Sequence, residues 1–97
     1  MAAMTAPLAP PDQRHCKLVG VWTKELEYAA ANWNEMDWAC KVDFDFEWFG
    51  ANLPRLAIVR AESEAGLLGP ADRAALAAFE NLLVQHAAFL AEVAEGN

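Results

Sequence analysis

The regular spacing of side chains near the C-terminus constrains the fold more than any other feature. A row of mostly apolar residues recurs there at alternating steps of three and four: Leu76, Phe79, Leu83, His86, Leu90 and Val93. This is the repeat of one face of an α-helix, and the alanines between these positions also favour helix. The pattern predicts one helix over residues 70–95, whose apolar seam packs against a core or against a second copy of the chain.

Three further segments carry helix signals. The predicted helices span residues 12–33, 35–41 and 53–65. Apolar side chains recur at helical spacing in the first and last of these, and Asn34 is a favourable N-cap for the middle one. The glycines favour a break at residues 50–52 and a turn at 66–70.

Residues 42–48 fit two conformations. Acidic and apolar side chains alternate there with period two, which favours a half-buried strand. However, the sequence offers no convincing partner strand, and a lone strand leaves its backbone groups unpaired. We therefore favour a helical or irregular segment, with a short strand over 42–48 as the alternative. The expected fold is mainly α, a small bundle of about four helices.

The length of 97 residues allows one hydrophobic core. Residues 1–11, which are rich in Ala and Pro and carry no charge, are predicted to be a flexible leader, and residues 12–97 a single helical domain. The predicted core consists of Leu18, Trp22, Leu26, Leu53, Leu56, Leu76, Phe79, Leu83, Phe89, Leu90 and Val93.

Charge and aromatic side chains gather in the middle of the chain. The net charge is −7, and residues 24–49 hold −5 of it, with seven acids against Lys24 and Lys41. Four Trp and five Phe are many for this length, and each ring can bury roughly 150–250 Å², so we expect some of them on the surface. A negative field repels phosphate backbones, which argues against direct nucleic-acid binding and favours a basic partner.

Acidic and aromatic residues are densest between Lys41 and Phe49. The residues that we predict to contact a partner are Glu35, Asp37, Trp38, Asp43, Asp45, Glu47 and Trp48. Rigid rings fill pockets in a partner and carboxylates meet its Lys and Arg side chains, which is how many interfaces gain affinity and specificity. The alternative is a core element whose polar face happens to be acidic.

The sequence lacks the patterns of a catalytic or metal centre. The soft ligands His15, Cys16, Cys40 and His86 have no short chelating spacing, and no nucleophile or phosphate-loop motif occurs. We therefore expect no enzymatic activity, no metal and no cofactor. The chain also shows no signal-peptide pattern and no apolar run of membrane-spanning length, so we expect a cytoplasmic protein with both thiols free, with a Cys16–Cys40 disulfide as the alternative.

Two functions of different classes follow. The first is a small acidic binding module that inhibits or neutralises a larger basic, possibly nucleic-acid-handling protein, as an immunity protein, an antitoxin or a phage-encoded inhibitor does. The second is a homo-oligomeric helical adaptor or assembly subunit, a homodimer through the 70–95 helix, with no inhibitory role. No membrane contact is expected in either case.

Overall fold

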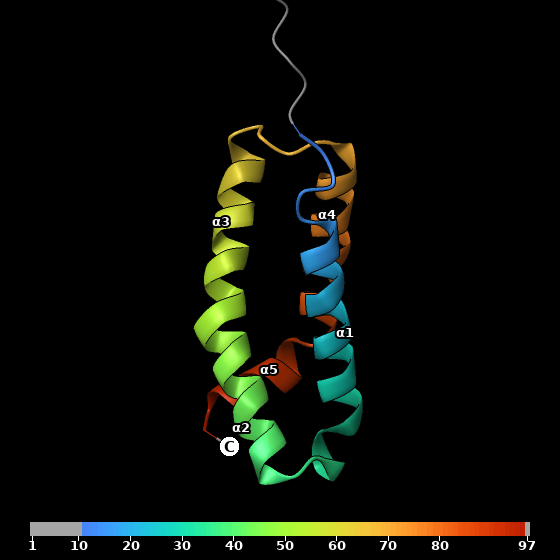
Figure 1. The fold of residues 1–97 in the computed structure, drawn as a ribbon. Helices are drawn as coiled ribbons and strands as arrows, with labels where there is room; N and C mark the ends of the chain where they lie inside the picture. Colours follow the sequence, from blue (N-terminus) through green and yellow to red (C-terminus); the bar gives the residue numbers. More distant parts are fainter. Residues whose placement is uncertain (1–10, 97) are drawn as a thin grey trace, which may run out of the picture.

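Helices account for nearly all of the part of the chain that the computed structural model describes, residues 11–96, and no strand occurs within it. The elements are α1 (Cys16–Asn32), the 3₁₀ turn η1 (Trp33–Glu35), α2 (Trp38–Glu47), the π-helical segment η2 (Trp48–Asn52), α3 (Leu53–Glu64), α4 (Pro70–Gln85) and α5 (Ala87–Ala94). Figure 1 shows α1 beside α4, with the run from α2 to α3 along the other side. The mainly α prediction is confirmed, and the strand alternative over 42–48 is wrong. The predicted leader over 1–11 lies, apart from Pro11, outside the described residues.

The chain continues as helix from α2 through η2 into α3, so the predicted break at residues 50–52 is wrong. Pro54 lies at the start of α3 and explains the π-helical turn before it. A proline has no N–H to donate, and its ring would clash with the carbonyl four residues earlier in a regular α-helix. The turn widens instead, and the N–H of Leu53 donates to the carbonyl of Trp48, five residues back.

Helix α2 begins three residues later than the predicted helix 35–41. Its N-cap is Asp37 and not Asn34, because the Asp37 carboxylate accepts a hydrogen bond of 2.8 Å from the backbone N–H of Cys40. Residues 33–35 form the separate turn η1, and Met36 is extended.

The predicted helix over 70–95 is broken at His86 into α4 and α5, which are bent by 69°. The bend turns α5 across the bundle, between α1 and α2 (Figure 1), and brings Phe89 against Trp33, with ring centroids 5.3 Å apart. No single helix in residues 11–96 is long and apolar enough to cross a membrane. Only α4 and α5 together meet the length and composition criterion, and they do so across this bend.

A chain of aromatic rings runs through the core and links α1, η1, α2, η2, α4 and α5. Ring centroids 5.3–6.1 Å apart connect Trp22, Phe79, Trp48, Phe44, Phe89 and Trp33. All eleven predicted core residues are buried or packed against this cluster. The buried apolar residues outside the predicted core list are Val19, Ala29, Phe44, Trp48, Val59 and Leu68, and the charged residue Asp72 is buried as well. The seam of α4 and α5 therefore faces the chain's own core; a homodimer through it stays a prediction.

Two aspartates fasten the start of α1 to the start of α4. Asp12 accepts hydrogen bonds from the backbone N–H groups of Ala71 and Asp72 at 3.1 and 3.0 Å, and Asp72 accepts two of 3.0 Å from those of Arg14 and His15. Asp12 thus caps the first turn of α4, and Asp72 holds the residues just before α1, which begins at Cys16 and not at residue 12. A Cβ at Gly69 would lie 2.6 Å from that of Asp12, so only glycine leaves room for this contact.

Candidate functional site

One face of α2 presents apolar side chains to solvent. Trp38 is 79 % exposed, Phe46 is 78 % exposed and Val42 lies between them at 40 %. These residues are four apart, so they form a row along one side of the helix, here called the α2 stripe. Sequence reasoning selected Trp38 but missed Phe46, although the spacing of four residues was available as a signal.

The structure corrects the prediction that Trp48 contacts a partner. Its side chain is 1 % exposed and stacks on Phe44 inside the aromatic core. Phe44 on α2 and Trp48 at the start of η2 are also four residues apart, and they lie on the side of this continuous helix opposite the stripe. The helix therefore divides the aromatic residues of this segment between core and surface.

The predicted carboxylates flank the α2 stripe. Each residue turns a helix by about 100°, which places Asp43 and Glu47 together on one flank and Asp45 on the other. All three are exposed. Glu35 is exposed on η1, and Asp37 caps α2, where the hydrogen bond from the backbone N–H of Cys40 lowers its pKa. The structure thus brings Trp38, Asp43, Asp45 and Glu47 together on α2, whereas Asp37 caps the start of that helix.

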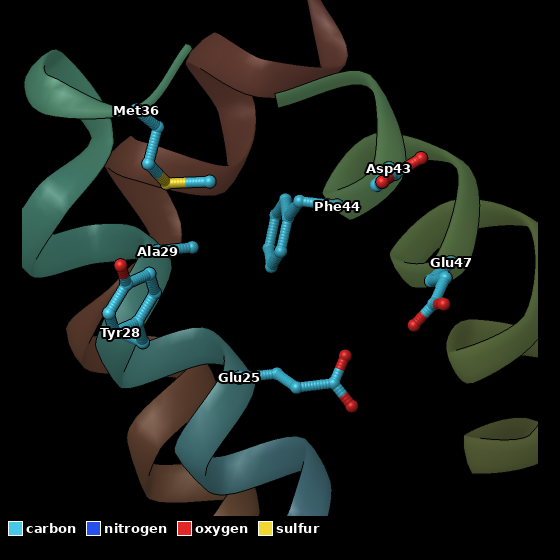
Figure 2. Close-up of a pocket in the computed structure, with 7 residues that line it drawn as sticks. All are labelled: Glu25, Tyr28, Ala29, Met36, Asp43, Phe44 and Glu47. Atoms are coloured by element: carbon cyan, nitrogen blue, oxygen red, sulfur yellow. The ribbon is translucent and has the colours of Figure 1, made fainter. Parts of the chain in front are cut away.

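A hollow of about 200 Å³ lies between α1 and the Asp43 flank of α2, here called the α1–α2 pocket. Its lining residues are Glu25, Tyr28 and Ala29 from α1, Met36 from the connection, and Asp43, Phe44 and Glu47 from α2. In Figure 2 the ring of Phe44 points from α2 toward α1, and Glu25 extends from α1 toward Glu47. Sequence reasoning missed Glu25 and Tyr28, because only the packing of α1 on α2 brings them to the acidic segment.

Glu25 lies in an unfavourable place for a carboxylate. Burial raises its pKa most, and the Glu47 carboxylate raises it further by repulsion and by accepting a hydrogen bond from the protonated Glu25. The ion pairs among residues 11–96 are made by Glu62 and Glu80, and none involves a carboxylate of the pocket. The pocket thus concentrates negative charge that has no cationic partner within the described part of the chain.

A second hollow of about 320 Å³ has a different character. His15, Leu18, Arg55, Ile58 and Val59 line it, so no carboxylate faces it. No group of three or more His, Cys, Asp or Glu side chains within residues 11–96 could hold a metal ion. The acidic, aromatic surface of α2 with its pocket is therefore the candidate site.

No protein-family model matches this chain, and no curated protein or solved structure is significantly similar to it. Inferences about function therefore depend on the surface itself.

Proposed function

We propose that this protein is a binding module that docks on a basic protein through the α2 stripe and its flanking carboxylates. The observation that carries the proposal is the exposure of Trp38 and Phe46, at 79 % and 78 %, between carboxylates without an ion-pair partner among residues 11–96. Aromatic side chains are enriched at the centres of protein interfaces, and the rim around such a centre is polar.

The proposed consequence of docking is inhibition. An acidic surface occupies positions on a basic protein that would otherwise hold phosphates, and complementary charge speeds the encounter. This is the physical logic of immunity proteins, antitoxins and phage-encoded inhibitors. The proposed compartment is the cytoplasm, where free thiols such as those of Cys16 and Cys40 persist.

The test is affinity capture from the native host with the full chain as bait. A basic protein should be recovered by the wild type and lost with the double variant Trp38→Ala/Phe46→Ala. Val84→Ala is the matched control, because Val84 is an exposed apolar residue, 76 % exposed, on α4. Capture that the double variant leaves intact would refute docking through the α2 stripe.

The inhibitory role has its own measurement. The captured protein, once purified, is assayed for its activity while the wild type is added in increasing amounts. Activity should fall to a plateau near one equivalent, and the double variant should leave it unchanged. Full activity in the saturated complex would mean that the protein binds without inhibiting.

A further inference from the structure

The α1–α2 pocket combines an aromatic wall with anionic ones. The Phe44 ring and Met36 form its apolar part, and Glu25 and Glu47 approach it from different helices (Figure 2). Carboxylates and aromatic faces both attract cations, whereas a neutral apolar ligand would strip water from these carboxylates and offer them nothing in return. The lining therefore selects an organic cation.

A guanidinium group suits this lining better than an ammonium group. It is planar, stacks on rings and carries five donors, so it can bond to carboxylates on two walls at once, while an ammonium is a compact and strongly hydrated charge. The hollow of about 200 Å³ is larger than the roughly 150 Å³ of a cavity that admits benzene, so a planar head group of that size fits. We propose that the pocket receives one arginine side chain, held between Glu25 and Glu47 and against Phe44.

The identity of the donor rests on the proposed function: the arginine belongs to the basic partner. Asp43 and Glu47 directly follow Val42 and Phe46 of the α2 stripe, so the pocket and the stripe adjoin. A partner whose apolar surface covers the stripe can insert an arginine beside it, and arginine is one of the residues enriched at interface hot spots. The positive charge would also stabilise the ionised form of Glu25, which burial and the Glu47 carboxylate disfavour.

The test uses small probes on the isotope-labelled full chain, followed by nuclear magnetic resonance. Acetyl-arginine amide should shift the signals of Glu25, Phe44 and Glu47 in a saturable way. Acetyl-citrulline amide has the same shape without the charge and should bind at least about fivefold more weakly. Acetyl-lysine amide, which keeps its free ammonium, should fall between the two.

Matched variants locate the effect. Glu25→Gln and Glu47→Gln should each weaken the arginine probe by about fivefold, whereas Glu27→Gln, an exposed position on α1 outside the pocket, should not. The proposal is overturned if arginine shifts none of these signals, if citrulline binds equally well, if lysine binds as tightly as arginine, or if neither pocket variant matters. If capture of a partner depends on Trp38 and Phe46 but the arginine probe does not bind, the arginine pocket is refuted and the proposed function stands. If the arginine probe binds but capture does not depend on these two residues, the proposed function is refuted and the pocket stands.

Discussion

Asp72 is a buried carboxylate that lies between the start of α4 and the start of α1. Its side chain is 1 % exposed, so burial raises its pKa, but hydrogen bonds from the backbone of His15, from the Cys16 thiol and from the backbone of Arg14 outweigh this and lower the pKa below its ordinary 3.8. A buried carboxylate with this many donors is stabilised in its charged form. The charge of Asp72 is therefore part of what joins α1 to α4.

We expect Asp72→Asn to destabilise the protein by about 2 kcal/mol at pH 7, because the charge is lost and one of the two accepting oxygens becomes a donor that faces another donor. Asp72 has a lowered pKa in the folded state, so its contribution is complete above the unfolded value of about 3.9 and disappears as the pH falls through the folded value. Urea unfolding of the wild type and the variant should therefore differ less at pH 3 than at pH 7.

The control for this experiment is Asp45→Asn, at an exposed position on α2, which should leave stability unchanged at both pH values. A difference between Asp72→Asn and the wild type that is as large at pH 3 as at pH 7 would show that the carboxylate charge is not what holds the two helices.

Glu25 should behave in the opposite sense. Its pKa is raised in the folded state, so its ionisation opposes folding once the pH rises above the unfolded value of about 4.3. We expect Glu25→Gln to stabilise the protein at pH 7 by less than about 1 kcal/mol, since solvent still screens the pair with Glu47. The gain should vanish below pH 4, where Glu25 is protonated in both states. Thermal unfolding at the two pH values measures this, and a loss of stability at pH 7 would contradict it.

Among the helices, the bend between α4 and α5 is the feature that could not be predicted from the sequence. Residues 84–88 contain neither glycine nor proline, and the apolar row runs past His86 without interruption, so nothing local predicts the bend. The bend places Phe89 against both Trp33 and Phe44. Burial of apolar surface thus outweighs the helical hydrogen bonds that a straight helix would keep, and this balance depends on residues distant in sequence.

We expect a local effect from Phe89→Ala. Without the ring, α5 should lose its contact with the core, and amide hydrogen exchange at residues 87–94 should accelerate far more than in α1 and α4, where it should rise only by the loss of global stability. The global stability should fall by about 2 kcal/mol, less than for a fully buried phenylalanine because Phe89 is half-buried.

The exposed Val84→Ala on α4 should change neither measurement. Uniformly faster exchange in α1, α4 and α5 would mean instead that α5 unfolds only together with the rest of the bundle.

The surface of α2 could be predicted only in part. The sequence shows the acidic and aromatic composition of residues 38–48, but which side chains face solvent depends on whether the segment has the repeat of a helix or of a strand. The alternation of acidic and apolar residues left strand and helix open, and only the helical period sends Phe44 and Trp48 inward and Trp38 and Phe46 outward. The contribution of Glu25 to the same site depends on tertiary packing and could not be predicted at all.

The two ends of the bundle differ: hydrogen bonds hold the helices together at one end, and the candidate site lies at the other. Figure 1 shows the start of α1, the α3–α4 connection and the start of α4 at one end, and α2 with α5 at the other. Hydrogen bonds of Asp12 and Asp72 fasten the first end, whereas the second carries the α2 stripe and the pocket. Changes at the docking surface should therefore leave the fold intact, which makes binding measurements interpretable.

The net charge of −7 acts on any basic partner at long range, but the local arrangement of charge should dominate. The Debye length is about 8 Å at physiological ionic strength, so only carboxylates near the contact steer the encounter effectively. We expect the triple variant Asp43→Asn/Asp45→Asn/Glu47→Gln to slow association with the captured partner by about tenfold at low salt and to flatten its salt dependence. Stopped-flow or surface-based association rates across a salt series measure both effects.

The matched control removes the same number of charges elsewhere, at the exposed Glu27, Glu64 and Glu95. With all three replaced by Gln, the net charge equals that of the α2 variant, so a purely global field would slow association equally in both. Steering by the α2 surface instead requires a clearly larger effect in the first variant, because its carboxylates lie within a Debye length of the docked partner. Equal slowing would mean that the net charge, and not the carboxylates on α2, determines the association rate, and it would remove the charge argument for docking through α2.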